Sequence, residues 1–190
     1  MKYLVVYAHP NPKSFNHAIK EEIVAKLKRE GHEYVVRDLN ELKFHPVLSG
    51  SDFTSFKQGK MPDDIKREQD HIRNADVLIF IYPTWWYGMP AILKGYIDRV
   101  FSYGFAYEFN EKGLQGLLPD KKVIIFNTTG GPAEYYAEAG YNDAIRKTID
   151  AGTFELCAMK VLIHKFFYAV TSIDDAARKK MLDELRDMKF

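Results

Sequence analysis

One segment of the sequence combines the side chains and the position of an anion site. Residues 9–16 read His-Pro-Asn-Pro-Lys-Ser-Phe-Asn and follow directly on an apolar run. A helical pattern begins at the end of this segment, and the first N–H groups of a helix attract phosphate. Ser14 and Asn16 add polar groups, and His9 or Lys13 can add charge. The same residues are equally compatible with a plain helix cap by Ser14. The segment is neither G-x-G-x-x-G nor a P-loop, which disfavours nicotinamide Rossmann domains and nucleotide triphosphatases.

A second segment places three large aromatic residues side by side. Trp85, Trp86 and Tyr87 follow another apolar run and precede Gly88 and Pro90. Pro90 favours the start of a helix, and Gly88 lets the backbone approach a neighbour closely. Aromatic residues gathered in a loop are typical of walls that bind planar ligands. The alternative is a hydrophobic plug between two helices.

A third segment follows a further apolar run and reads Thr-Thr-Gly-Gly-Pro at 128–132. Two consecutive glycines permit backbone conformations in which successive N–H groups point into one concavity that binds anions. Such a nest beside a ring stabilises negative charge that develops on the ring. The same residues are also consistent with a tight turn alone.

The hydrophobic pattern predicts the elements that must position these segments. Short apolar runs, several of them apolar on both sides, are typical of parallel strands covered by helices. The predicted strands are 4–8, 34–36, 77–82, 123–126 and 161–170. The predicted helices are 15–29, 63–74, 90–101, 138–151 and 173–188, with Gly31 and Gly152 ending the first and the fourth.

This alternation predicts an α/β fold, in which a doubly wound parallel sheet carries helices on both faces. For five strands we expect the order 2-1-3-4-5, and such sheets bind ligands at the carboxyl ends of their strands. Because all three segments follow strands, we expect them to meet at one edge of the sheet. The segment 40–61 is too long for a plain connection and is expected to pack over the site or a partner.

Composition limits the class of protein. The 190 residues carry 27 Lys and Arg against 26 Asp and Glu, a formal net charge of +1, which argues against a nucleic-acid binder. Cys157 is the single cysteine, so no internal disulfide can form, and no metal site is expected. We find no signal peptide and no apolar stretch that could cross a bilayer. We therefore expect a single domain over 1–190, in the cytoplasm.

Several motifs occur together over nearly the whole chain, from residue 2 to about residue 188. They are His9 with Ser14, Phe15 and Asn16, the run Pro-Thr-Trp-Trp-Tyr-Gly-Met-Pro-Ala-Ile-Leu-Lys-Gly at 83–95, Phe-Ala-Tyr at 105–107, and Thr-Thr-Gly-Gly at 128–131 with Tyr136. This combination resembles the NAD(P)H:quinone oxidoreductases of the DT-diaphorase and modulator-of-drug-activity type, which have the flavodoxin-like fold.

The resemblance implies a flavoprotein oxidoreductase that binds FAD, with FMN as the other candidate. It implies ping-pong turnover, in which a hydride passes from NAD(P)H through the flavin to a quinone or similar acceptor. It also implies a homodimer whose active sites lie where two subunits meet.

The resemblance assigns roles to individual residues. His9, Ser14, Phe15 and Asn16 would hold the pyrophosphate, and Arg178 would serve FAD. Pro83, Thr84, Trp85, Trp86 and Tyr87 would lie along the isoalloxazine, and Thr128, Thr129, Gly130, Gly131 and Tyr136 would face its pyrimidine edge. Trp86, Tyr87, Tyr107 and Tyr136 would form the pocket for nicotinamide and quinone, with Tyr136, Trp86 and Tyr107 as the catalytic residues.

Two positions depart from the family pattern. Asn142 stands where the animal enzymes carry a histidine thought to relay protons, and Phe109 replaces a second pocket tyrosine. Because an amide cannot relay a proton, proton delivery is left to Tyr136, another residue or water.

Other reactive side chains are expected to be structural. Lys94 and Asp98 have the i,i+4 spacing of a helical ion pair, and Cys157 and His164 are expected in the core.

Two other functions would use a similar flavin site. One is an ancillary regulatory subunit of a potassium-efflux transporter, and the other is a flavodoxin-like electron carrier, against which the near-neutral charge argues.

Overall fold

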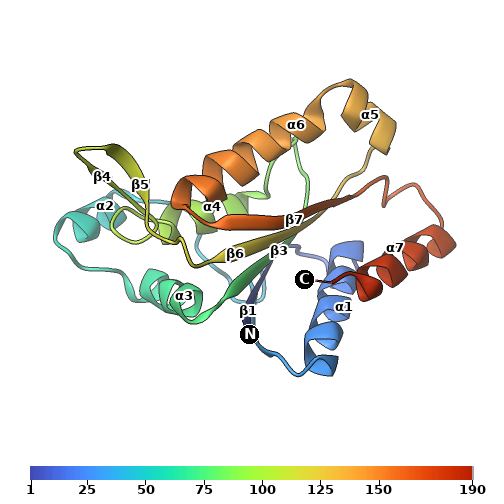
Figure 1. Ribbon diagram of the computed structural model, residues 1–190, viewed down its shortest axis with the longest axis horizontal. Coiled ribbons are helices and arrows are strands. Elements are labelled where there is room, and N and C mark those ends of the chain that lie inside the picture. Colours follow the sequence, from blue (N-terminus) through green and yellow to red (C-terminus); the bar gives the residue numbers. More distant parts are fainter. Residues whose placement is uncertain (190) are drawn as a thin grey trace.

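The computed structural model describes residues 1–189 and contains the predicted parallel sheet (Figure 1). Its strands are β1 (Lys2–Tyr7), β2 (Glu33–Asp38), β3 (Val77–Pro83), β6 (Lys122–Thr128) and β7 (Lys160–Phe167). Their order across the sheet is β2-β1-β3-β6-β7, which confirms the predicted 2-1-3-4-5 arrangement. Phe190, the last residue of the expected 1–190 domain, lies outside the described residues.

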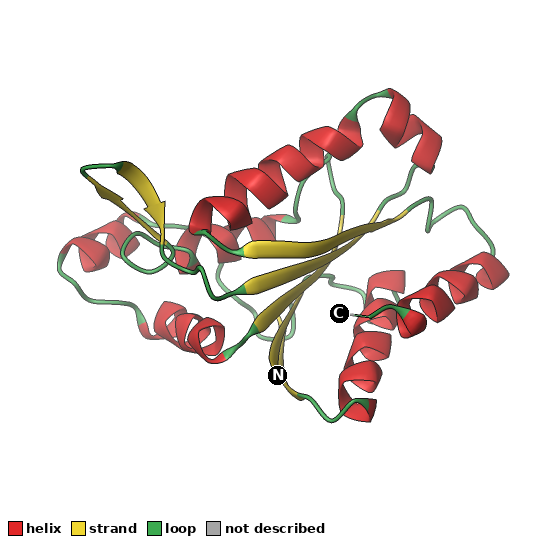
Figure 2. Cartoon of the chain, in the orientation of Figure 1, coloured by secondary structure: helices red, strands yellow, loops and turns green. Residues whose placement is uncertain are grey.

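Helices cover both faces of the sheet (Figures 1 and 2). In β1, Tyr3, Val5 and Tyr7 are buried on one face, and Leu4 and Val6 are buried on the other, which explains why the strand is apolar throughout. The first face is covered by α1 (Phe15–Arg29) and α7 (Asp175–Asp187), and the second by α3 (Asp63–Asn74), α4 (Ala91–Val100) and α6 (Tyr141–Arg146).

The predicted helix at 138–151 is wrong at both ends. A shorter helix, α5 (Ala133–Glu138), comes first, and Gly140 with a φ of 70° separates it from α6. α6 continues into a π-helix, η1 (Lys147–Phe154), so Gly152 lies inside a helix and does not end one. A 3₁₀ turn, η2 (Glu155–Cys157), completes this segment.

The last strand is shorter than the predicted 161–170. β7 ends at Phe167, because Ala169 has a φ of 55° and its N–H donates to the carbonyl oxygen of Gly131 instead of continuing the ladder. Three further short elements were not predicted from the sequence. They are α2 (Gly50–Lys57) and the antiparallel hairpin of β4 (Tyr107–Asn110) and β5 (Gly113–Gly116).

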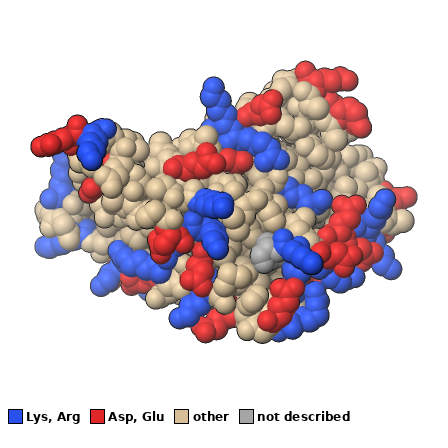
Figure 3. Space-filling model, viewed as in Figure 1, with Lys and Arg blue, Asp and Glu red and all other residues tan. Residues whose placement is uncertain are grey.

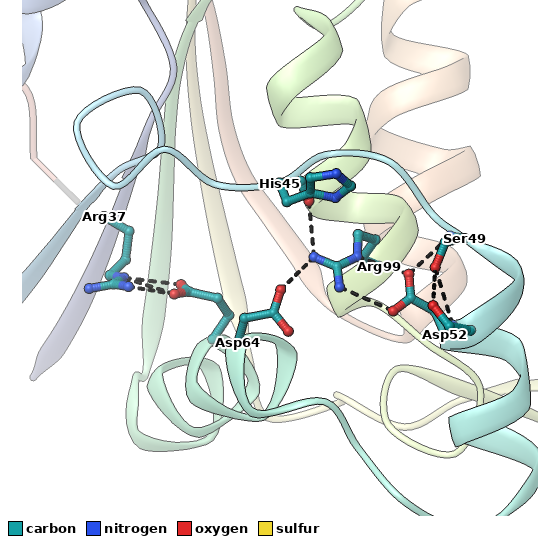
Figure 4. Close-up of polar contacts among 8 residues, drawn as sticks. Arg37, His45, Ser49, Asp52, Asp64 and Arg99 are labelled. Atoms are coloured by element: carbon teal, nitrogen blue, oxygen red, sulfur yellow. Dashed lines mark hydrogen bonds and ion pairs between the residues drawn. The ribbon is translucent and has the colours of Figure 1, made fainter.

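An ion-pair network fastens the segment 40–61 to the rest of the fold (Figure 4). Arg99 of α4 donates to both carboxylate oxygens of Asp52, at 3.1 Å each, to Asp64 at 2.6 Å and to the carbonyl oxygen of His45 at 2.9 Å. The segment therefore packs against α3 and α4. None of its residues lines the cavity described below, so within its own chain the segment does not cover that cavity, and packing over a partner stays a prediction.

The surface carries no single-sign charge field on the face that Figure 3 shows, where basic and acidic side chains are interspersed. Within residues 1–189, no helix combines the length and apolar character needed to span a bilayer.

Candidate functional site

A cavity of about 450 Å³ lies at the carboxyl edge of the sheet, within the volume range of small-molecule and cofactor sites. Its lining comes from the segments that follow β1, β3, β6 and β7, and consists of His9, Asn11, Ser14, Phe15, Asn16, Pro83, Thr84, Trp85, Thr128, Thr129, Gly130, Val170 and Thr171. The structure thus brings the three predicted segments together. Asn11 belongs to the predicted segment 9–16 without a role of its own, and Thr171 follows the last predicted strand, where such sheets bind ligands, whereas Val170 was expected inside that strand.

The first segment presents the start of α1 to this cavity. Ser14 is the N-cap of the helix, and its hydroxyl accepts from the N–H of His17 at 3.1 Å. The N–H groups of Phe15 and Asn16, the first two residues of the helix, have no carbonyl partner within it, so they are available to an anion. His9 accepts from the N–H of Asn11 at 3.0 Å, and burial lowers the pKa of its imidazole. A neutral His9 serves this site as a hydrogen-bonding group rather than as a charge.

Asn16 is the most constrained polar group of the cavity. Its side chain is buried, and its Nδ2 donates to Oγ1 of Thr128 at 2.8 Å. Its Oδ1 is buried without a hydrogen-bond partner. An unpaired buried acceptor costs about 1–3 kcal/mol, so a ligand that brings a hydroxyl or N–H group to it is favoured. The polyol chain of a flavin carries such hydroxyl groups, and the residues present fit a flavin at this point.

The aromatic segment forms a tight turn. Trp85 and Gly88 exchange backbone hydrogen bonds of 3.1 and 3.0 Å, and between them Trp86 and Tyr87 have φ values of 50° and 59°. Two consecutive residues with positive φ define a type I′ turn, which normally takes Asn and Gly. Bulky side chains in this conformation are strained, and such strain gathers at functional sites. Trp86 is 98% exposed, so nothing in its own chain packs on it.

Tyr87 belongs to a cluster of tyrosine rings beside the cavity. Its ring stacks on Tyr141 with centroids 3.9 Å apart, and lies 5.8 Å from the buried ring of Tyr136. Burial raises the pKa of the Tyr136 phenol, so it is protonated near neutral pH. Tyr168 donates to Oδ1 of Asn142 at 2.9 Å, which gives the residue that departs from the family pattern a structural partner.

Gly130 and Gly131 do not use the unusual backbone conformations that two consecutive glycines permit. Neither Gly130 nor Gly131 has a positive φ, so neither needs the left-handed freedom of glycine. A Cβ atom on Gly131 would lie 3.2 Å from Cε2 of Tyr136, and close packing is therefore the reason for a glycine there. Thr129 holds the turn by donating from Oγ1 to the carbonyl oxygen of Gly131 at 2.9 Å. An anion nest at this turn stays a prediction.

A second cavity of about 520 Å³ adjoins the first and shares Ser14, Phe15 and Val170 with it. Arg178 lines this second cavity, together with residues of α1 and α7. Its guanidinium donates to the carbonyl oxygens of Val170 and Ile173, at 3.1 and 2.6 Å, and to the Asp175 carboxylate. Arg178 is thus fixed in place by the residues that precede and begin α7.

Tyr107 is not brought to this site by its own chain. It lies on the hairpin that precedes β6, whereas the cavity lies where β6 ends (Figure 1). There it lines a separate, largely apolar hollow of about 440 Å³ with Leu48, Phe53, Phe56 and Tyr103. Trp86, Tyr87, Tyr136 and Gly131 border the first cavity without lining it.

The residues expected to be structural are so. Lys94 pairs with Asp98 on the surface of α4, and Cys157 is buried, which raises the pKa of its thiol to about 11. His164 is buried with two hydrogen-bond partners, Asp150 and Asn127. Among residues 1–189, no group of three potential His, Cys, Asp or Glu ligands could hold a metal ion.

The fold is that of an α/β protein with a cavity at the carboxyl ends of its strands, and the chain belongs to the family described as flavodoxin-like fold, which matches residues 1–188. Within that class, the chain is 38% identical to an uncharacterized NAD(P)H oxidoreductase of Haemophilus influenzae, covering 96% of this chain and 91% of the relative. It is 35% identical to human ribosyldihydronicotinamide dehydrogenase [quinone], covering 95% and 87%. A solved structure, NAD(P)H:quinone oxidoreductase from Methanothermobacter marburgensis, superposes with a TM-score of 0.88 at 30% identity, covering 98% of this chain and 95% of the other. These similarities confirm the resemblance drawn from the motifs.

Proposed function

We propose that this protein is a flavin-dependent NAD(P)H:quinone oxidoreductase, formed by one domain over 1–190. The observation that carries the proposal is the edge cavity, where segments from four strand ends surround a buried, unpaired acceptor on Asn16. The relatives named above are an NAD(P)H oxidoreductase, a ribosyldihydronicotinamide dehydrogenase [quinone] and an NAD(P)H:quinone oxidoreductase, and these names support the same activity here. The cytoplasm stays a prediction.

Different groups of residues around the cavity would hold different parts of a flavin. His9, Ser14, Phe15 and Asn16 would hold the pyrophosphate at the start of α1, where the helix dipole is positive. Pro83, Thr84, Trp85, Trp86 and Tyr87 would lie along the isoalloxazine, and Thr128, Thr129, Gly130, Gly131 and Tyr136 would face its polar edge. When bound, the flavin supplies the hydride acceptor that links NAD(P)H to the quinone.

Tyr136 is the proposed proton donor. Its raised pKa keeps the phenol protonated, and its ring is held by contacts with Tyr87, Tyr141 and Tyr168. We expect Tyr136→Phe to lower kcat for quinone reduction while flavin binding stays within about twofold, because the ring packing is kept. An unchanged kcat would assign proton delivery to water or to another residue.

FAD is the proposed cofactor rather than FMN. The two adjoining cavities give room for both halves of a dinucleotide, and the second is lined by Arg178 and by Ala18 of α1. Filling the second cavity with Ala18→Leu should weaken FAD binding about tenfold and leave FMN binding unchanged. Equal binding of FAD and FMN by the wild-type protein would support FMN instead.

A homodimer with the site at its interface is the proposed assembly. Trp86 is exposed on a strained turn, and Tyr107 lies on the β4–β5 hairpin, at the end of the main sheet opposite the cavity (Figure 1), so in this proposal a second copy brings the two residues together. Mixing two inactive variants, Trp86→Ala and Tyr107→Ala, tests this arrangement. If each site takes Tyr107 from the partner, a mixed dimer has one intact site and activity returns. If both residues act within one chain, mixing restores nothing.

The activity itself is tested on the purified protein. We expect a bound flavin that is released by heat, is bleached by NAD(P)H without oxygen, and supports menadione reduction. Asn16→Leu should weaken flavin binding about tenfold, or about 1.4 kcal/mol, whereas the exposed Asn110→Ala should not. A protein that NAD(P)H cannot bleach is not this enzyme.

A further inference from the structure

A chain of side-chain hydrogen bonds runs from the π-helix to the edge cavity. Oδ1 of Asp150 lies 2.6 Å from Nδ1 of His164, and Nε2 of His164 lies 3.1 Å from Oδ1 of Asn127. Nδ2 of Asn127 donates to Oγ1 of Thr84 at 2.6 Å. Thr84 lines the cavity in which we place the flavin. Four residues from four different elements therefore connect η1, β7 and β6 to the segment after β3.

The middle of this chain is dry. The side chain of His164 has no exposed surface, Asn127 is fully buried, and the Asp150 side chain is 14% exposed. One face of the His164 imidazole stacks on the ring of Phe166, with centroids 4.6 Å apart and planes 8° from parallel. Buried polar groups that are fully paired hold one arrangement, since water cannot replace a lost partner.

The charged and titratable neighbours of His164 come from three elements. Asp150 of η1 is paired, through its other oxygen, with Arg146 at 3.5 Å, and Arg146 also donates to the carbonyl oxygen of His164 at 2.7 Å. Tyr82 of β3 has a buried hydroxyl without a partner, and burial together with the Asp150 charge raises its pKa. Tyr82 is therefore neutral, and Asp150 and Arg146 are the charges that face the ring.

The donor and the acceptor of each hydrogen bond between Asp150 and Thr84 can be followed in turn. Asn127 turns its Oδ1 to His164, so Nε2 of the ring is the donor in that hydrogen bond, and the Asp150 carboxyl group shares a proton with Nδ1. Asn127 then donates to Thr84, whose oxygen accepts, which leaves the Thr84 hydroxyl proton free for an acceptor in the cavity.

A His164 ring with a bare Nε2 reverses this order. With Nε2 bare, the Asn127 amide turns its Nδ2 to the ring and its Oδ1 to Thr84. The Thr84 hydroxyl must then donate to Asn127 and offers only lone pairs to the cavity. The protonation state of a histidine without contact to the cavity thus decides whether Thr84 donates or accepts there.

We propose that Asp150, His164 and Asn127 are positioning residues that hold Thr84 as a hydrogen-bond donor to the bound flavin, and so favour its reduced form. The proposal rests on the proposed flavin site. A donor to the ring stabilises the electron-rich reduced form more than the oxidised form, because hydrogen bonds to the ring tune a cofactor's potential. This route to the cavity does not include Asn142.

The first test measures the potential of the bound flavin in a double-mutant cycle. Thr84→Val removes the donor, and Asp150→Asn keeps the shape of the carboxyl group but removes the partner that shares a proton with Nδ1 of His164. Each should shift the reduction equilibrium about tenfold toward the oxidised flavin, or about 30 mV for a two-electron couple. The double variant should shift no further than either single one. Thr84→Ser should keep the wild-type potential. His32→Gln, which changes a histidine that takes no part in this series of hydrogen bonds, should also keep it.

The second test does not need flavin. Nitrogen-15 NMR of the imidazole should show Nε2 of His164 protonated in the wild-type protein, and bare in Asp150→Asn. Thr84→Val should move the Nε2 resonance of His164, although the substituted side chain would not touch the ring. Additive potential shifts, or a His164 resonance that ignores Thr84→Val, would overturn the coupling. A protein that binds no flavin but shows the NMR coupling would refute the proposed function and leave the hydrogen-bond chain standing.

Discussion

Replacing Arg99 by methionine tests the contact that fixes the segment 40–61. Arg99 and Asp52 are both buried, and their pairing is bidentate (Figure 4). Removing one partner of a buried pair costs about 3–5 kcal/mol, because the other charge is left unpaired. Here Asp52 keeps one donor, the N–H of Ser49 at 3.0 Å, and methionine keeps most of the arginine stem volume. We therefore expect a loss near the lower end, about 3 kcal/mol.

The assay is urea unfolding followed by circular dichroism, with thermal unfolding beside it. For a chain of this length, about 3 kcal/mol lowers the melting temperature by roughly 6–12 °C. Lys94→Met is the matched control on the same helix. It breaks an i,i+4 pair with Asp98 whose side chains are 61% and 38% exposed, and such pairs contribute less than about 1 kcal/mol.

A second variant separates the unpaired charge from lost packing. Asp52→Asn together with Arg99→Met removes both charges, and we expect it to recover a large part of the lost free energy of unfolding, since no buried charge is left alone. If Arg99→Met costs no more than Lys94→Met, the network does not stabilise the fold and the reasoning is refuted.

Two other predictions concern the same segment. The hydrogen bond from Arg99 holds the pKa of Asp52 below its usual range, so its contribution to stability is complete above about pH 4, the unfolded value, and is lost as pH falls through the folded pKa. The difference in urea midpoint between wild type and Asp52→Asn should therefore shrink as the pH is lowered from about 6 to about 3, and a constant difference would contradict the pairing. Gly95→Ala would place a Cβ atom 2.0 Å from the carbonyl oxygen of Pro46, so we expect a net loss of about 2 kcal/mol despite the better helix propensity of alanine. Gly50→Ala, which meets nothing within 4 Å, should be neutral or stabilising by up to about 1 kcal/mol, and equal effects of the two substitutions would show that the close approach to Pro46 is absent.

Local patterns in the sequence were sufficient for much of the fold. Helix α1 begins and ends where the sequence predicts, at Phe15 and Arg29, because Ser14 caps it and its apolar spacing matches one helical face. The strand order followed from five apolar runs and from the rules of parallel sheets. The convergence of the segments at 9–16, 83–85 and 128–130 followed from the same rules, since the carboxyl ends of parallel strands share an edge.

The tertiary structure decided what depends on contacts between distant residues. Arg99 and Asp52 are far apart in the sequence, and neither has a local pattern that marks it as buried. The left-handed turn at Trp86 and the π-helix that carries Asp150 also escape residue periodicity, because both are deviations from the regular backbone to which periodicity refers.

Local residue spacing was enough to predict the class of fold, the edge of the sheet that carries the candidate site, and the loops that reach it, because backbone geometry ties these features to spacing along the chain. That Tyr107 lies away from the cavity of its own chain, and that His164 is joined to this cavity through Asn127, could be seen in the packed structure alone. The physical reason is that hydrogen bonds and ring contacts depend on side-chain positions in space, which packing sets after the elements have formed.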